Sequence, residues 1–311
     1  MRNDRSAPEG AGAGAAGRLD AETRLLAGRP RRRHRAWRRL SSDPGAVGGA
    51  LILGLVLFSA YFAPMIAPWH YDDQLLARKL RPALSSHQGQ LFVLGTDQLG
   101  RDVVSRIIYG AQVSVLIGTV GVVTGAVLGI VIGLVAGWFE GWPSTVLMRL
   151  ADVQLAFPYL LLAIAVIAVL GPSLLNLIIV LGLRTWVVFA RVIRGSVLAT
   201  KPLEFVESAR ASGAATAYLL CRHILPNVVA PITVLATVEF ANLILLEATL
   251  SFLGLGVQPP FPSWGMMLSD ARRYLFTEWQ LSVYPGVAIM LTVLGANLLG
   301  DGLRDAFDPR L

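Results

Sequence analysis

The segment VSVLIGTVGVVTGAVLGIVIGLVAGW, residues 113–138, contains no charged side chain. An apolar helix needs about 20 residues to cross the hydrocarbon core of a bilayer, so this segment predicts a membrane-spanning helix. Further apolar runs separated by polar segments predict six spans in total, at 45–67, 113–138, 149–170, 174–195, 227–250 and 283–303. We therefore expect an all-α integral membrane protein with six transmembrane helices.

The composition of the whole chain agrees with a protein that lies largely in lipid. Hydrophobic residues make up 54% and charged residues 15% of the 311 positions, and the mean hydropathy is +0.60. The surface of a soluble globule needs more charge than this, so one membrane domain is expected. The single cysteine, Cys221, excludes an internal disulfide and a cysteine metal cluster, and we expect no metal site.

The distribution of charge predicts the orientation of the chain. The net charge is +7, and basic side chains concentrate between Arg29 and Arg39, directly before the first span. Because Lys and Arg are enriched in cytoplasmic flanks, the cluster predicts a cytoplasmic N-terminus beside anionic lipid rather than a nucleic-acid-binding surface. Six spans return the C-terminus to the same side, so we expect a multi-pass protein of the plasma (inner) membrane with both termini cytoplasmic.

These assignments divide the chain into four parts. They are a basic, partly disordered cytoplasmic tail at 1–44, the first transmembrane helix at 45–67, an extracytoplasmic loop at 68–112 and a five-helix core at 113–311. Within the core, residues 200–226 are expected in the cytoplasm and residues 251–282 outside.

Glycines recur at every fourth position of the second span. They are Gly121, Gly125, Gly129, Gly133 and Gly137. Small residues let helix backbones approach closely where lipid provides no hydrophobic drive, so this glycine stripe predicts a helix-packing face. The same face would also suit a sliding surface used in gating.

Polar residues inside the expected spans mark a second kind of site. They are Arg184, Glu239, Asn242, Glu247 and Asn297. Because such residues are costly in lipid, they usually face protein or a water-filled path, and we treat them as a candidate translocation path. Arg184 fits either a solute path or a structural ion pair, with Glu239 or Glu247 as the opposite charge. The glutamates and Asn242 share one side of the fifth helix.

The chemistry of an enzyme is missing from the sequence. The phosphate-binding loop GxxxxGK[ST] is absent, and neither lysine of the chain, Lys79 or Lys201, follows a glycine. The HExxH and GxSxG patterns of hydrolases are also absent. We therefore expect no catalytic residue and no cofactor in this chain.

The cytoplasmic segment predicts a helix, a turn and a second helix. Pro202 suits a helix start, and Glu204 and Glu207 suit its first turns. Gly213 suits the turn, where we expect a positive φ, and residues 214–225 resume helical character as far as Pro226.

A motif in this segment resembles the coupling motif of ABC importer permeases. The stretch Glu207-Ser-Ala-Arg-Ala-Ser-Gly213, followed by Ile224-Leu-Pro226, keeps the landmarks of that motif, which reads EAA, three residues, G, nine residues, I, any residue and LP. The departures are Ser208 at the second position and His223 at the isoleucine position. The resemblance assigns ATPase coupling to Glu207, Ser208, Ala209, Gly213, Leu225 and Pro226.

Three further motifs resemble the oligopeptide, dipeptide and nickel permease family. They are Leu94-Gly-Thr-Asp97 with Gly100-Arg-Asp-Val103, Ser251-Phe-Leu-Gly-Leu-Gly256 with Pro262-Ser-Trp-Gly265, and Gly300-Asp-Gly-Leu-Arg-Asp305 with Asp308-Pro309. The resemblance extends from about Trp37 to Leu311 and is to the second, C-type permease subunit of such systems.

The family resemblance implies a type I ABC importer permease, with one span followed by a core of five. It implies a translocation path shared with a second permease, two ATPase subunits that hold ATP and Mg, and an extracytoplasmic solute-binding protein. Di- or oligopeptides are the expected solutes, and nickel, glutathione or another small solute is the alternative. A secondary transporter working alone and a membrane enzyme are the competing functional classes.

Overall fold

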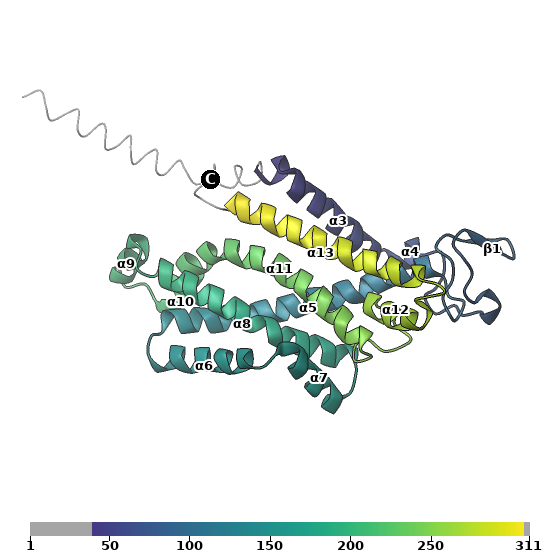
Figure 1. The fold of residues 1–311 in the computed structure, drawn as a ribbon. Coiled ribbons are helices and arrows are strands. Elements are labelled where there is room, and N and C mark those ends of the chain that lie inside the picture. Colours follow the sequence, from purple (N-terminus) through teal and green to yellow (C-terminus); the bar gives the residue numbers. More distant parts are fainter. Residues whose placement is uncertain (1–38, 308–311) are drawn as a thin grey trace, which may run out of the picture.

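The computed structural model describes residues 39–307, which form an elongated bundle of helices (Figure 1). Within residues 39–307, five helices are long and apolar enough to cross a membrane. They are α3 (Pro44–Tyr61), α5 (Val103–Trp138), α8 (Leu174–Thr200), the helical run Thr216–Phe252 and α13 (Gln280–Phe307). The bent pair α6 (Trp142–Ala156) and α7 (Tyr159–Leu170) is long and apolar enough together to form either a sixth, broken span or a re-entrant loop.

The third span is broken rather than straight, which corrects the expectation of one helix over 149–170. The axes of α6 and α7 differ by 86° across Phe157 and Pro158. Pro158 cannot donate a backbone hydrogen bond, and its ring disfavours helical backbone at the preceding residue. Phe157 accordingly lies in the extended region, with φ −95° and ψ 135°.

Side-chain caps set the starts of several helices. Asp43 accepts a hydrogen bond from the Gly45 amide at the start of α3 (3.0 Å), and Asp102 accepts one from the Ser105 amide at the start of α5 (2.7 Å). The cap at Asp102 makes α5 begin at Val103 instead of residue 113. With 36 residues, α5 is about 54 Å long at 1.5 Å per residue, so it extends beyond the hydrocarbon core.

The other span boundaries also differ from expectation. The first span ends at Tyr61, and Phe62 separates it from the short helix α4 (Ala63–Ile66). The fourth span continues to Thr200, and the last one covers Gln280–Phe307. In each case, the helix ends at a different residue from the apolar run.

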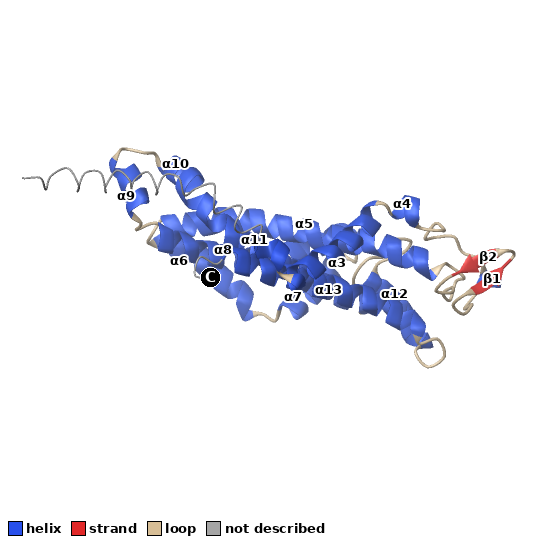
Figure 2. Ribbon diagram, turned by 90° about the horizontal axis from the view of Figure 1, so that it is seen from above, coloured by secondary structure: helices blue, strands red, loops and turns tan. Residues whose placement is uncertain are grey.

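Small elements occupy the two ends of the bundle. At one end lie the 3-10 turn η1 (Leu76–Arg78) and the antiparallel hairpin of β1 (Ser85–His87) and β2 (Gln90–Phe92), with α12 (Trp264–Ala271) and η3 (Arg272–Tyr274) nearby (Figure 2). At the opposite end lie α9 (Glu204–Ala211) and α10 (Thr216–Tyr218), followed by the π-helical segment η2 (Leu219–Ile224) and α11 (Leu225–Phe252). The end of α13 lies toward the α9 end in both views (Figures 1 and 2).

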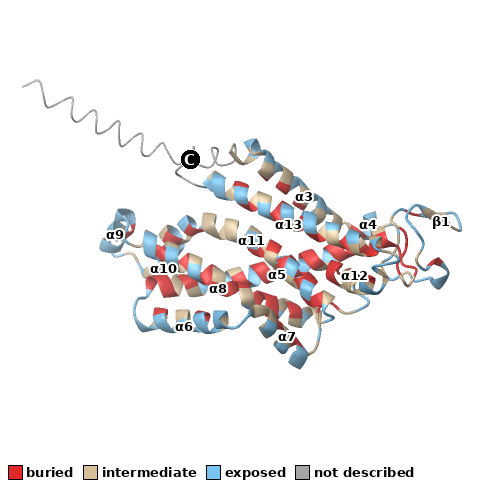
Figure 3. Cartoon of the chain, in the orientation of Figure 1, coloured by how far each residue is buried: buried red, intermediate tan, exposed pale blue. Residues whose placement is uncertain are grey.

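The buried core lies among α5, α8 and α11 (Figure 3). Ile117, Leu181, Phe189 and Leu243 are fully buried there. The outer faces of α6 and α7 are exposed and apolar. Such a surface is stable against lipid or against another membrane protein, but not against water.

The glycine stripe places the backbone of α5 against α8 and α11. A β-carbon added at Gly137 would stand 2.6 Å from Val197 Cβ, and one at Gly133 would stand 2.7 Å from the Ala190 carbonyl oxygen. Gly125 and Gly129 face α8 in the same way, and Gly121 faces Leu243 of α11. Only a residue without a side chain fits these contacts.

A second close contact joins α3 to α13, and the sequence analysis did not identify it. A β-carbon at Gly49 would stand 2.7 Å from the Gly295 carbonyl oxygen, and Gly302 faces Ala46. Bare backbone thus also holds the first span against the last one.

We expect Gly129→Leu to destabilise the helix bundle. The new side chain would overlap Phe189 and the Trp186 carbonyl, whose oxygen lies 2.7 Å from the position of an added β-carbon. Overpacking of this kind costs about 1–3 kcal/mol, and α5 and α8 must separate to relieve it. The measurement is the melting temperature and membrane abundance of the purified variant.

Two variants control this experiment. Gly54→Leu makes the same substitution where an added β-carbon has no neighbour within 4 Å, and Leu128→Ala removes an exposed side chain from another face of α5. Both are expected to retain the parent melting temperature. Equal tolerance of Gly129→Leu would show that the stripe does not hold the bundle together.

Candidate functional site

The expected coupling segment forms a short exposed helix, α9, at one end of the bundle. The helix begins at Glu204, with Leu203 as its N-cap, rather than at Pro202. Glu204 and Glu207 lie in its first turn, where negative charge stabilises the partial positive charge of a helix N-terminus. Glu207 and Ser208 are exposed, and Ala209 is partly buried.

Gly213 ends α9 in the left-handed conformation that the sequence predicts. Its φ is +83°. The Ala214 amide donates to the Ala209 carbonyl (3.2 Å), and the Gly213 amide donates to the Arg210 carbonyl (3.0 Å). This pair of bonds is a Schellman motif, which requires a residue at positive φ and therefore favours glycine.

The second part of the segment continues without interruption into α11. Pro226 does not end the helix as the sequence analysis supposed, because it lies in the first turn of α11 directly after the π-helical η2. Backbone hydrogen bonds in a π-helical segment join residues five apart instead of four. This change of pattern occurs next to Pro226, which has no N–H to donate. Leu225 is partly buried and Pro226 is exposed.

Ring contacts join the two parts of the coupling segment. His223 contacts the ring of Phe205 on α9 and the ring of Tyr218 on α10, with centroid distances of 6.0 and 5.7 Å. Val206 of α9 is buried against the main core. The segment is therefore packed as one unit on the start of α11.

Exposed apolar side chains are the feature of α9 that the sequence analysis missed. Leu203, Phe205 and Tyr218 are all exposed at this end of the molecule. The sequence did contain a signal for them. Apolar residues precede and follow Glu204 in a segment that is expected in the cytoplasm. Such residues on a short amphipathic helix suit a hydrophobic groove on a soluble partner.

A pocket of about 270 Å³ lies between α9 and the ends of α5 and α8. The Lys201 ammonium donates to Glu140 (2.7 Å) and to the Trp138 carbonyl (3.1 Å), and it lies over the Trp138 ring. Lys201 also holds the pKa of the exposed Glu140 carboxyl below its usual value of 4.5. Glu207 and Arg210 line the α9 side of the pocket.

Within the spans, the structure joins Arg184 of α8 to Glu239 of α11. Arg184 Nη1 lies 2.7 Å from Glu239 Oε2, and the Asn242 amide nitrogen lies 3.2 Å from Glu239 Oε1. The guanidinium also lies 5.6 Å from the ring centre of Tyr159 on α7. Of the two glutamates that the sequence left open, Glu239 is therefore the partner of Arg184.

Glu247 has a different environment. It is fully buried, and it accepts hydrogen bonds from Ser114 (3.1 Å) and Ser251 (2.7 Å). No basic side chain within residues 39–307 forms an ion pair with it. Asn297 on α13 is exposed, and no hydrogen bond in this range joins it to the other candidate residues. The five candidate path residues thus do not form one cluster.

Polar contacts between α6, α7 and α8 were also missed by the sequence analysis. The Tyr159 hydroxyl donates to the Val180 carbonyl (2.5 Å), and Gln154 accepts from the Trp186 indole (2.9 Å). An ion pair joins Arg191 to Asp152 (2.6 Å). Asp152 and Gln154 stood within the expected third span, and their polarity was the signal that this span is not surrounded by lipid.

At the opposite end, the motif formed by Leu94–Asp97 and Gly100–Val103 folds around Asp97. This buried carboxylate pairs with Arg101 and Arg106, each at 2.7 Å, and Arg106 also pairs with Asp270 on α12 (3.3 Å). Trp264 of α12 is buried, and its indole donates to the Ile107 carbonyl (3.0 Å). The motif residues thus tie the loop and α12 to the start of α5.

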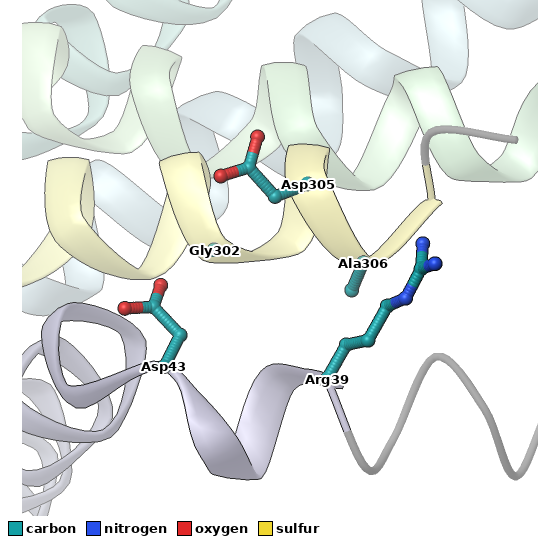
Figure 4. A pocket seen from close by; sticks show the side chains of 5 residues that line it. All are labelled: Arg39, Asp43, Gly302, Asp305 and Ala306. Atoms are coloured by element: carbon teal, nitrogen blue, oxygen red, sulfur yellow. The ribbon is translucent and has the colours of Figure 1, made fainter. Parts of the chain in front are cut away.

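The closing motif lines a pocket between α3 and α13. Its volume is about 290 Å³, and Figure 4 shows Asp43 on one side and Asp305 on the other, with Arg39 at its edge. Gly302 and Ala306 complete the lining. The last two residues of the motif, Asp308 and Pro309, lie outside the described residues. In the described part of the chain, no group of three or more His, Cys, Asp or Glu side chains is placed to hold a metal ion.

Comparison with known families identifies two matches. Residues 129–311 match the family described as binding-protein-dependent transport system inner membrane component. Residues 32–83 match the N-terminal transmembrane domain of oligopeptide transport permease C.

Individual relatives cover most of the chain. A di/tripeptide transport system permease protein of Pseudomonas aeruginosa is 44% identical over 276 residues, which cover 88% of this chain and 91% of the relative. A dipeptide transport system permease protein of Escherichia coli K12 is 46% identical, covering 88% and 92%. A glutathione transport system permease protein of Shigella flexneri is 45% identical over 278 residues, covering 89% and 90%.

The Arg184–Glu239 contact predicts energetic coupling between the two residues. Arg184→Leu leaves Glu239 unpaired, and an unpaired charge inside a span costs about 2.5–3.5 kcal/mol on the insertion scale. Adding Glu239→Gln removes that charge and is expected to restore part of the loss, with a coupling energy of about 0.5–3 kcal/mol. The measurement is the melting temperature and membrane abundance of the single and double variants.

Glu247→Gln is the matched control for this cycle, because Glu247 lies on the same helix and has no basic partner in the described part of the chain. Combined with Arg184→Leu, it should give only the sum of the two separate effects. Additive effects with Glu239→Gln as well would reject the pair as a stabilising contact.

Proposed function

We propose, since this chain belongs to the family of binding-protein-dependent transport system inner membrane components, that it is the permease subunit of an ATP-driven importer of short peptides. The observation that carries the proposal is the identity of 44–46% with peptide and glutathione permeases over about nine-tenths of their length. Dipeptides, tripeptides and glutathione, itself a tripeptide, share a small polar backbone with charged ends. That class of solute is therefore the one proposed for this chain.

The proposal includes the partners that such a permease needs. A second permease subunit would complete the translocation path, and two ATPase subunits would supply ATP hydrolysis with ATP and Mg. An extracytoplasmic solute-binding protein would deliver the peptide. The exposed apolar surfaces of α6 and α7 and the exposed apolar residues of α9 are consistent with subunit contacts in the membrane and in the cytoplasm.

We propose that α9 moves as a rigid body and transmits the movement of an ATPase subunit to the membrane spans. The Schellman motif at Gly213 fixes the angle between α9 and α10, and the His223 contacts keep the two parts together. A displacement of α9 by an ATPase subunit would then be passed to α11 along a continuous helical run. Alternating access requires the ATPase to contact the inward- and outward-facing states differently, and α9 is the proposed place of that contact.

The orientation of the chain follows from the same proposal. The α9 end would face the cytoplasm with both chain termini, and the end with β1 and β2 would face outside. The Arg29–Arg39 cluster, most of which lies outside the described residues, supports a cytoplasmic N-terminus. The ends of α13 and α9 lie toward the same end of the bundle (Figure 1), which agrees with a cytoplasmic C-terminus.

Single cysteines in a Cys221→Ser background are expected to report this topology. Gln88→Cys in the β1–β2 turn should react with a membrane-impermeant thiol reagent added outside intact cells. Ser212→Cys at the end of α9 should react only after the membrane is opened. The measurement is labelling before and after permeabilisation, and labelling of position 88 from the cytoplasmic side alone would refute the orientation.

Gly213→Val is expected to uncouple the transporter. A β-branched residue in the left-handed region costs roughly 1–2 kcal/mol or more, so the chain should leave the Schellman motif and displace α9. Peptide uptake and transport-linked ATP hydrolysis should fall at least severalfold while membrane abundance persists. Both activities are measured on the reconstituted complex.

Gly171→Val is the matched control, because Gly171 has a similar φ of +84° in the turn between α7 and α8, far from α9 along α8. With ψ at 151°, Gly171 lies in a region that only glycine adopts readily, so this variant strains the backbone at least as much without touching the coupling segment, and coupling should be retained. Unchanged uptake in a correctly inserted Gly213→Val variant would refute the role given to this turn.

A further inference from the structure

We propose that Arg184 and Glu239 form a binding site for the two charged ends of a zwitterionic peptide during its passage. Arg184 would take the peptide carboxylate, and Glu239 would take the peptide ammonium group. This inference rests on the proposed function as a peptide permease. It adds a recognition site within the membrane to recognition by a solute-binding protein.

The site is open on the side of Arg184. The Arg184 side chain is 26% exposed, whereas the Glu239 side chain is 5% exposed. Among the described residues, the bond from Nη1 to Glu239 is the only hydrogen bond of the guanidinium, and its remaining nitrogens are not among the buried unpaired atoms. Donors of a guanidinium that stay accessible inside a span must meet water, protein or a polar solute, because lipid offers them no acceptor.

The site lies at membrane depth. At 1.5 Å per residue, Arg184 stands about 15 Å from Leu174 and about 24 Å from Thr200, the two ends of α8. The Tyr159 ring beside it belongs to the first residue of α7, so the break of the third span lies at the same level. Broken backbone at this depth is tolerated where it is buried in protein or lines a water-filled cavity.

The chemistry of the pair matches a zwitterion. The planar fork of a guanidinium binds a carboxylate through two parallel hydrogen bonds, and a carboxylate accepts from an ammonium group. Asn242, already bonded to Glu239, adds an amide beside the same carboxylate. A neutral ion pair and a neutral zwitterion can exchange partners without change of net charge, so neither partner is left as an isolated charge in the membrane.

The resident glutamate also keeps the binding weak, as passage requires. An unpaired arginine would hold a passing carboxylate tightly, and conduction needs sites that a solute can leave. Glu239 competes with the peptide carboxylate for Arg184 and re-forms the pair after the peptide departs. The same pair thus binds the solute and helps to release it.

The test measures binding of three probes to the purified complex without its solute-binding protein. The probes are a dipeptide, its C-terminal amide and its N-acetyl derivative, followed by saturation-transfer NMR, which detects weak ligands. The parent should prefer the dipeptide over the amide by about tenfold, the usual effect of a charge-assisted hydrogen bond. Arg184→Gln should remove that preference, and Glu239→Gln should remove the preference for the free ammonium over the N-acetyl group.

Two further variants complete the test. Arg191→Gln makes the same change on α8 at an exposed ion pair and should leave both preferences as in the parent. Arg184→Lys keeps the charge but loses the planar fork, so its preference for the carboxylate should fall between those of the parent and Arg184→Gln. Because each preference compares probes on one preparation, a lower yield of a variant does not affect it.

Three results would overturn the proposal. They are equal binding of the dipeptide and the amide by the parent, a carboxylate preference that survives Arg184→Gln, and the loss of all three probes to the same degree in Arg184→Gln. Failure of the proposed function is a separate result, since the reconstituted complex with its binding protein would then import no dipeptide at all.

Discussion

The contact of bare backbone between α5 and α8 is the interaction on which the rest of this structure depends. Lipid solvates leucine as well as a neighbouring helix does, so helices in a bilayer associate through close van der Waals contact. The glycine stripe provides that contact at four successive turns against α8. The position of α8 then fixes Arg184 within the membrane and Lys201 at its end, and Lys201 in turn holds Glu140, just beyond the end of α5.

Ion pairs and charge-assisted hydrogen bonds hold the two ends of the bundle together, beyond the glycine stripe. At the end that carries β1 and β2, Asp97 binds Arg101 and Arg106, while Arg106 reaches Asp270 of α12. At the α9 end, Lys201 bridges the ends of α5 and α8. Between these ends, the Arg184–Glu239 pair is more buried than the Arg191–Asp152 pair, so its two charges must compensate for a larger loss of water.

The sequence predicted the features that arise from local patterns. Apolar length located the spans, and the glycine at position 213 in a short polar segment predicted the positive φ that the structure confirms. Features that arise from tertiary contacts were not predictable in this way. The start of α5 at Val103 depends on a capped, buried loop, and the contact of Gly49 with α13 depends on which spans are neighbours. The choice between Glu239 and Glu247 as partner of Arg184 also required the relative rotation of α8 and α11.

The break at Pro158 has a consequence for the surrounding lipid. α6 has 15 residues and α7 has 12, so their lengths are about 22 and 18 Å, and neither alone covers a hydrocarbon core of about 30 Å. Because the two axes differ by 86° and α6 runs along the bundle, α7 extends sideways and widens the protein in the half of the membrane nearer β1 and β2. The two leaflets therefore surround different cross-sections of the same chain. The elastic energy of the bilayer around this protein then depends on the lateral packing of the leaflet nearer β1 and β2 as well as on membrane thickness.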